Sequence, residues 1–437
     1  MHTRRILLFT VLLLMTPVLA TASTARLEGL GVIPDFVEDY ANMFAYPVSI
    51  ARYPGVVIGE LGVYGSYDRG FGATMGLGQD YKYGVFGIML RENSGFAPVP
   101  GWTGSYGSQF DLLWGMNFGR AAFGVRVDNS SSEFGYKVGD DYSYTISPLY
   151  FLYMYMEDIV PSDENNTGIT LSAGFDVRET DKVEAAFEYR TLNFEIDARS
   201  GASHEKIQDA GNASYGFRGR GFFNVAENIT LVPMVGYSKY DWGWEITSTV
   251  PDDEDSGDQA LTTMTGGLGV KVDVGSMFMI GVGFSQTKAT TDFTYAEAAP
   301  AASYPETFEF TSTAAPFLFG CLETPIRDWL TVRFGAQKKL VNEKMTLEFV
   351  GPGYEKWDFT TKNGVIPSEF RTYVYEDGGV TMPYFNEPFT FSLGVGFKFG
   401  NLDIDATMND YYPFTGMYWL SGVASTPFSR ISATYHY

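Results

Sequence analysis

From Val57 to the last residue, the sequence is built of short segments in which apolar and polar side chains alternate. In Phe110–Phe118 every second residue is bulky and apolar, and Phe389–Phe399 repeats the pattern. A period of two places alternate side chains on opposite faces of a β-strand. After the first 22 residues, no stretch has the 18 or so consecutive apolar residues of a transmembrane helix. The chain is therefore predicted to be all-β.

Two classes of connection alternate between these segments. One class is short, as at Gly119–Arg120 and Gly400–Asn401, and the other is long, as at Asn129–Gly168 and Val341–Glu387. Short turns on one side and long loops on the other are typical of outer-membrane barrels, and about 9 to 11 residues let a tilted strand cross the membrane. The strands of a secreted β-sandwich or β-propeller also alternate apolar and polar residues, but these folds do not predict short and long connections in alternation. We predict a transmembrane antiparallel β-barrel of about 16 strands, with about 14 as the alternative because the first pair of strands is weak.

The first 22 residues have the three parts of a secretory signal peptide. Two arginines precede a largely apolar run, Ile6–Leu14, and small residues follow at Ala20–Ala22. We therefore expect a signal peptide at 1–22, a periplasmic or lumenal segment at 23–55 and the barrel at 56–437. The expected location is the outer membrane of a Gram-negative-type bacterium.

The charge and the rare residue types exclude several functions. The formal net charge of −22 argues against nucleic acid as a partner. Cys321 is the single cysteine, which excludes a disulfide framework. Outside the signal peptide the histidines are His204 and His436, and neither lies in a catalytic motif. The acidic stretch Pro251–Asp258 lacks the glutamate that closes a calcium loop. The sequence predicts no enzyme, no cofactor and no metal site.

Before the first strand, Asp35 and Glu38 have the spacing of a helix capping box, and apolar residues follow at helical spacing. A short helix is expected here, inside the barrel as a plug. The stretch that follows, FAYPVSIA at Phe44–Ala51, resembles the F-x-N-P-A-G-L-A segment of the FadL-type transporters of fatty acids and hydrocarbons. Leu393–Asp410 also resembles the penultimate hairpin of that family.

The resemblance covers about 20 residues at the N-terminal stretch and departs from the family there: Tyr46 replaces Asn, and Val48-Ser49 replaces Ala-Gly. It implies an N-terminal hatch, with Phe44, Tyr46 and Pro47 as plug residues, inside a 14-stranded barrel. It also implies passage of a hydrophobic compound.

Charged residues of both signs fall on the face opposite the apolar one, which would line the lumen. This pattern is typical of a network of ion pairs that fills a barrel interior, or of polar groups that grip a ligand. The expected cationic ligand contacts are two pairs, Arg218 with Arg220 and Arg333 with Lys339, which suit a carboxylate or phosphate. The expected apolar contacts lie in the loop segment Thr145–Asp158: Tyr150, Phe151, Tyr153 and Tyr155.

The chain ends on a strand-like stretch, Pro427–Tyr437, with Ile431 and Tyr435 on its apolar face and Arg430 on its polar face. Tyr435 and Tyr437 resemble the C-terminal signal that the barrel-assembly machinery recognises. The expected partners are that machinery, outer-membrane lipid and a hydrophobic small molecule. The sequence thus predicts a channel or passive transporter for small solutes, hydrophobic ones included. The alternative is a plugged structural or adhesion barrel that transports nothing.

Overall fold

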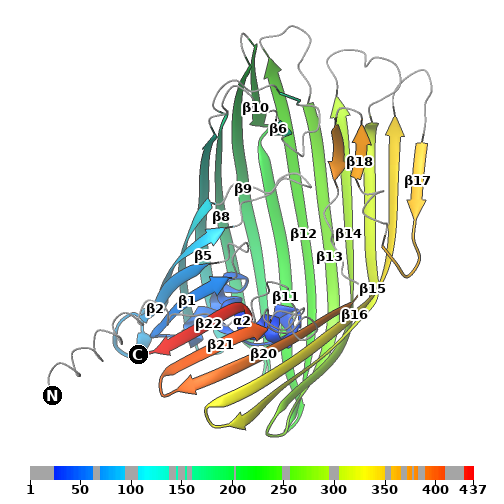
Figure 1. The fold of residues 1–437 in the computed structure, drawn as a ribbon. Helices are drawn as coiled ribbons and strands as arrows, with labels where there is room; N and C mark the ends of the chain where they lie inside the picture. The colour runs from blue at the N-terminus through cyan, green and yellow to red at the C-terminus, as the bar shows by residue number, and fades with distance from the viewer. Residues whose placement is uncertain are drawn as a thin grey trace, which may run out of the picture.

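The computed structural model describes residues 24–62, 69–93, 107–136, 144–145, 153–154, 160–200, 203–248, 256–294, 305–349, 356–365, 372–375, 378–381, 389–408 and 428–437. Within these residues, sixteen antiparallel strands close into a barrel, because the last strand pairs with the first (Figure 1). The sixteen strands are β1 (Val56–Gly62), β2 (Gly70–Gly76), β3 (Val85–Asn93), β4 (Gly107–Phe118), β5 (Ala121–Tyr136), β8 (Val160–Asp176), β9 (Lys182–Ser200), β11 (Asn212–Ala226), β12 (Ile229–Ser248), β13 (Ser256–Asp273), β14 (Met277–Thr294), β15 (Pro305–Arg327), β16 (Leu330–Phe349), β20 (Phe389–Phe399), β21 (Leu402–Met408) and β22 (Phe428–His436). The predicted fold class is confirmed, and the strand number is 16, not the 14 that the family resemblance implies.

The wall has an uneven height (Figure 1). The strands β1 and β2 have 7 residues each, whereas β12 has 20 and β15 has 23. The predicted length of about 9 to 11 residues is therefore wrong for the tall side, β8 to β16. The tall side is extended further by β10 (Ser203–Asp209), which pairs with β9 and β12, and by β17 (Lys356–Thr360), which pairs with β16. Two small sheets are formed by β6 (Tyr144–Thr145) with β7 (Tyr153–Met154) and by β18 (Thr372–Tyr375) with β19 (Gly378–Thr381).

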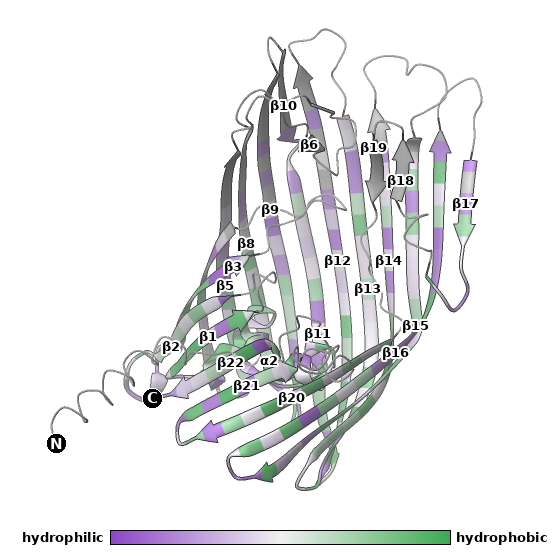
Figure 2. Ribbon diagram, viewed as in Figure 1, coloured by the Kyte–Doolittle hydropathy of each residue, from purple (hydrophilic) through white to green (hydrophobic). Residues whose placement is uncertain are grey.

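The side chains of β14 show where the membrane belt ends. Phe278, Ile280, Val282 and Phe284 are 44–49% exposed on the outer face, and Met279 is buried on the inner face. After Phe284, the outward positions become polar: Gln286, Lys288, Thr290 and Asp292. A lipid-facing wall must be apolar, so the upper part of this strand stands above the hydrocarbon layer, as the hydropathy colouring shows for the tall wall (Figure 2).

The chain before β1 lies inside the barrel, at the end that carries the short turns (Figure 1). We call residues 24–55 the N-terminal segment. It consists of α2 (Thr24–Leu30) and three 3-10 turns, η2 (Pro34–Phe36), η3 (Tyr40–Phe44) and η4 (Pro47–Arg52). A further turn, η5 (Gln79–Tyr81), joins β2 to β3. The short-turn end is the periplasmic end in barrels of this class. None of the helices in these residues is long and apolar enough to cross a membrane.

The predicted short helical segment before the first strand is confirmed, but it is not one continuous helix from Asp35 to Phe44. The structure breaks this stretch into η2 and η3, separated by extended backbone at Val37 and Asp39. Asp35 does not cap a helix: its carboxylate accepts a hydrogen bond from the Tyr46 hydroxyl at 2.6 Å. The cap of η3 is Asp39, which accepts from the amide of Ala41 at 3.0 Å. The apolar residues at helical spacing do not form one helix here, because contacts with the barrel wall outweigh the local helix propensity.

Candidate functional site: the lumen and its N-terminal segment

The N-terminal segment crosses the lumen from one wall to the other. Its α2 contacts β20 and β21, η2 contacts β12, and η4 contacts β4 and β5. A 16-stranded barrel is wide enough to leave a channel that wall side chains do not fill. The segment therefore occupies space that would otherwise be open at the periplasmic end.

Glycines on the inner wall let the backbone of the segment approach closely. A Cβ at Gly124 of β5 would lie 2.1 Å from the amide nitrogen of Val48, and one at Gly335 of β16 would lie 1.8 Å from the carbonyl oxygen of Leu30. Only a residue without a side chain fits at such positions. The amide of Val48 also donates a hydrogen bond to the Ser172 hydroxyl of β8 at 2.6 Å. The wall is thus shaped to receive this segment.

Three apolar clusters hold the segment from different sides. Leu27, Leu30 and Phe36 pack against inward side chains of β11 to β15, which include Cys321. Met43 and Ile50 pack against β1, β3 and β4, while Tyr46 and Val48 pack near Ala186 of β9. Removing this apolar surface from water is the main favourable contribution to docking.

Ion pairs join the segment to β15, β16 and β21. Arg26 donates to both carboxylate oxygens of Glu323, at 2.9 and 2.6 Å, and to Asp39 at 2.8 Å. Glu323 also accepts from Arg333 at 2.7 Å, and Arg333 reaches Asp405 at 2.6 Å. Four of these side chains, those of Arg26, Asp39, Arg333 and Asp405, line a cavity of about 320 Å³ beside the segment. Burial raises the pKa of Asp39 to about 6, although Arg26 opposes this effect.

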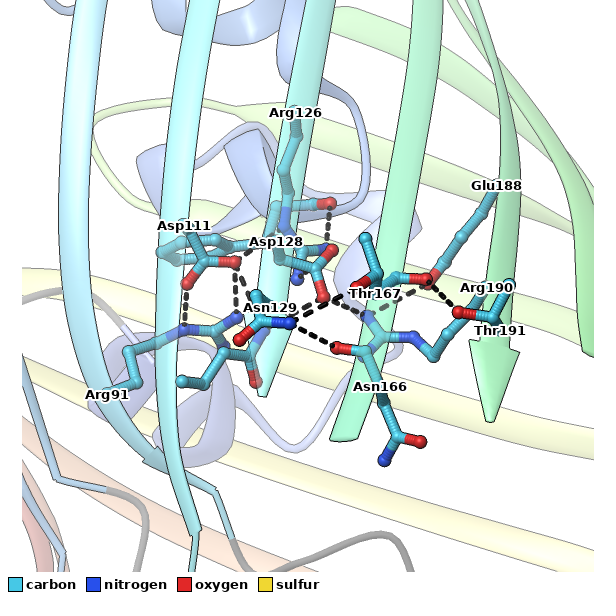
Figure 3. Close-up of polar contacts among 12 residues, drawn as sticks. Arg91, Asp111, Arg126, Asp128, Asn129, Asn166, Thr167, Glu188, Arg190 and Thr191 are labelled. Atoms are coloured by element: carbon cyan, nitrogen blue, oxygen red, sulfur yellow. Dashed lines mark hydrogen bonds and ion pairs between the residues drawn. The ribbon is translucent and has the colours of Figure 1, made fainter. Parts of the chain in front are cut away.

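A second ionic network lies on the inner wall of β3, β4, β5 and β9 (Figure 3). Asp111 accepts from Arg91 and Arg126, both at 2.7 Å, and Asp128 lies 3.1 Å from Arg126 and 2.5 Å from Arg190. Both carboxylates are fully buried, so each needs cationic partners to offset its desolvation. Arg126 also donates to the Phe44 carbonyl at 3.0 Å, which ties the network to the N-terminal segment. The charges here neutralise one another.

The predicted cationic ligand contacts separate into two groups. Arg220 and Arg333 are bound in ion pairs, Arg220 with Glu184 at 2.8 Å and Arg333 with Glu323 and Asp405. Arg218 also faces the lumen, but among the described residues it makes no hydrogen bond and no ion pair. Lys339 lies on the inner face of β16, opposite Phe317 of β15. Their roles in ligand binding remain predictions.

The other predicted site residues lie apart from this network. Phe44, Tyr46 and Pro47 belong to the N-terminal segment and contact the wall. Tyr150, Phe151 and Tyr155 lie outside the described residues, and Tyr153 is described only as backbone of β7. Tyr435 is exposed on the outer face of β22, and Tyr437 contacts the end of the N-terminal segment.

Three residues of the ionic network, Arg26, Asp39 and Glu323, were not predicted from the sequence as site residues. A signal existed for Glu323, which shares the inward face with Cys321 two residues before it. Arg26 and Asp39 carry no local signal, because their partners come from elsewhere in the chain. No three His, Cys, Asp or Glu side chains within the described ranges are placed to hold a metal ion.

Above the membrane belt, the tall wall turns apolar side chains inward. A bulge at Ala314–Phe317 shifts β15, so that Phe308 and Phe310 face the lumen there. They form a cluster with Ala289, Met345 and Leu347, each at most 2% exposed, and Phe359 of β17 packs against it. The same strands carry polar residues on their outer face at this height, so the cluster belongs to the interior of the barrel.

Comparisons with known proteins give only distant likenesses. No protein-family model and no curated protein matches the chain. Among solved structures, the chain is similar to a FadL homologue of Pseudomonas aeruginosa, with 11% identity, 96% and 98% of the two chains covered and a TM-score of 0.40. For the toluene transporter TbuX of Ralstonia pickettii the identity is 12%, the coverage 95% and 96%, and the TM-score 0.38. For the ferric yersiniabactin uptake receptor FyuA of Yersinia pestis the identity is 11%, the coverage is 81% of this chain and 68% of the receptor, and the TM-score is 0.38.

Likenesses at this level carry no argument about activity, so the assignment rests on the geometry of the chain itself. Its strands close without a free edge, its outer face carries an apolar belt, and its inner face is polar and charged. These are the requirements for spanning a membrane with strands. The chain is a transmembrane β-barrel of the outer-membrane type, with its own N-terminal segment in the lumen.

Proposed function

We propose that the protein is a passive outer-membrane transporter for small solutes, hydrophobic ones included, and that movement of the N-terminal segment opens it. One observation carries the proposal: a separate segment, and not the wall itself, occupies the periplasmic end of the lumen (Figure 1). The segment is bound in part through polar groups that water can replace, such as Arg26, Glu28 and Arg52, which are 23–39% exposed. Such contacts can be exchanged without unfolding the barrel.

Two features of the lumen support an amphipathic or apolar solute. Arg218 offers a cation that no described residue neutralises, and a guanidinium group attracts a carboxylate or phosphate. The inward cluster around Phe310 offers apolar contacts above the membrane, where Met345 can adapt to different shapes. The cluster is closed in this structure, so a solute would enter it by displacing the partly buried Phe359. Replacing Phe359 by serine removes the side chain that must be displaced and should therefore strengthen binding of a fluorescent apolar probe, whereas replacing the neighbouring Thr360 should not change it.

Planar-bilayer conductance of the purified protein tests the proposal. Deleting Arg26–Pro54 should give large, steady steps, while the full chain should give rarer or smaller ones. In a Cys321→Ser background, Val48→Cys with Ser172→Cys should lock the segment to β8, because the Val48 amide lies 2.6 Å from the Ser172 hydroxyl. The oxidised lock should abolish the steps and a reducing agent should restore them.

The plugged structural or adhesion barrel predicts a different result. If the full chain and the deletion variant both give no steps, the channel is excluded and the structural alternative stands. If the oxidised lock conducts as well as the reduced protein, movement of the segment is not required. Mass spectrometry of the purified protein should, on our proposal, find a co-purified lipid or fatty acid that the Arg218→Met variant retains less well.

A further inference from the structure

The barrel closes through a short and weakly paired seam. Strand β1 pairs with β22 from Val56↔His436 to Gly62↔Arg430, and with β2 only over Val56–Glu60. In contrast, β13 pairs with β14 over the whole of Ser256–Asp273. Each ladder position adds a small stabilising hydrogen bond, so the two sides of β1 are among the weakest junctions of the wall.

The helix α2 lies across the inner face of this seam and binds strands on both sides. The hydroxyl of Thr24 donates to Glu60 of β1. The amide of Ala25 donates to the Ser432 hydroxyl of β22 at 3.1 Å, and its carbonyl accepts from Thr407 of β21 at 2.7 Å. One turn of helix therefore connects the first strand to the last two.

Charged groups reinforce the same bridge. Arg430 of β22 donates to Glu28 of α2 at 2.8 Å and lies 3.8 Å from Glu60 of β1. The side chains of Arg430 and Glu60 are 8% and 11% exposed, whereas that of Glu28 is 39% exposed. Because Arg430 is largely desolvated between two carboxylates, losing a partner there costs more than losing a fully exposed ion pair.

Three further contacts stabilise the seam next to its periplasmic end. The hydroxyl of Tyr40 in η3 forms a hydrogen bond with Thr434 of β22. The backbone amide of Tyr437 donates to the Gly55 carbonyl at 3.0 Å, and its hydroxyl donates to the Thr74 carbonyl of β2 at 2.8 Å. The last residue of the chain is thus bound to the end of the N-terminal segment.

We propose that the N-terminal segment is a clasp for the barrel: through Thr24, Ala25, Glu28 and Tyr40 it holds β22 against β1 from inside. The clasp function does not depend on transport. It means that the segment cannot leave the wall at α2 and η3 without loosening the seam, so plug position and barrel closure are coupled.

Hydrogen–deuterium exchange on the full chain in nanodiscs tests the clasp. The clasp variant, Glu28→Gln with Tyr40→Phe, removes one charged and one neutral contact and should speed exchange of the seam amides, 56–62 and 428–436, about tenfold. The matched control, Ser172→Ala with Tyr46→Phe, removes two contacts of the segment far from the seam. It should leave these amides unchanged. Amides of β13 and β14 should not respond to either variant.

A seam disulfide provides an independent check. Gly59 and Ala433 are direct partners in the register, so cysteines at both positions, with Cys321→Ser, can close the seam covalently. The clasp variant should lose its heat-resistant compact form in detergent at a lower temperature than the wild type, and the oxidised disulfide should restore it.

Two results would overturn the clasp. One is seam exchange and a detergent transition in the clasp variant that equal those of the wild type. The other is an equal acceleration of seam exchange by the control variant, because the segment would then stabilise the barrel as a whole and not the seam.

Discussion

Arg220 of the wall lies against the face of Tyr46 in the N-terminal segment, with the guanidinium carbon 4.3 Å from the ring centroid. The same guanidinium donates to the Val37 carbonyl at 3.1 Å and to Glu184 at 2.8 Å, and Tyr46 donates to Asp35. A cation over an aromatic face is stabilising, most of all when it is desolvated. Tyr46 stands where the FadL-type pattern has Asn, so this departure from the pattern has a structural role: it holds two parts of the segment and the wall together.

Replacing Arg220 by methionine should destabilise the protein by about 3–5 kcal/mol, because the buried Glu184 loses one of its two cationic partners and keeps only the partly exposed Arg52. The matched control is Arg218→Met on the same inward face, which should change stability by no more than about 0.5 kcal/mol because Arg218 has no bond to lose among the described residues. Denaturant unfolding in detergent measures both. Equal effects of the two substitutions would show that Arg220 does not anchor the segment.

Gly124→Ala should displace the segment from the wall, because a Cβ there would lie 2.1 Å from the backbone of Val48. Overpacking of this kind typically costs about 1–3 kcal/mol. Limited digestion with chymotrypsin would report it as faster cleavage after Phe44. The control is Gly219→Ala on the outer face of β11, where the nearest atom is 3.6 Å away. Unchanged cleavage in the Gly124 variant would mean that the segment is not seated on β5.

Docking of the segment should strengthen as the pH falls. Burial raises the pKa of Asp39 from 3.8 to about 6, so the docked segment binds more protons than the released one between these values. The contribution of protonated Asp39 to docking is therefore fully present below about pH 4 and is lost as the pH rises through 6. Amide exchange of residues 24–55, corrected for its intrinsic pH dependence, should therefore accelerate from pH 5 to pH 7. If the Asp39→Asn variant shows the same pH dependence of amide exchange, another titrating group is responsible.

Deleting Tyr435–Tyr437 should prevent barrel assembly. The deletion removes the pairs of β22 with Val56 and Val57 of β1 and the contact of Tyr437 with Gly55. Tyr437→Phe keeps the ring and the backbone contact and loses only the hydrogen bond to Thr74, which costs about 1 kcal/mol, so this variant should assemble. Membrane fractionation and the heat-dependent shift in detergent gels measure assembly. A deletion variant that assembles normally would exclude an assembly role for these residues.

The sequence by itself determined which side chains face lipid and which face the lumen. The pleat of a strand alternates regardless of its neighbours, so Phe110–Phe118 and the inward charges could be placed correctly. Short turns such as Gly400–Asn401 narrowed the strand number to 16 or 14, and pairing of the weak first strands in the structure decided for 16. The length of the tall strands could not be read this way, because above the membrane an outward-facing side chain no longer has to be apolar, and the bulge in β15 exchanges its two faces.

Only the tertiary structure decided which inward groups meet. Glu28 and Arg430 are 402 residues apart, and Ala25 and Ser432 are 407 apart. No local pattern encodes such partners, because they are brought together when β22 reaches β1 and the register of every intervening strand is set. The same closure turned the stretch with helical spacing into two short turns, η2 and η3, since the glycine-lined wall offers more contacts than a free helix would make.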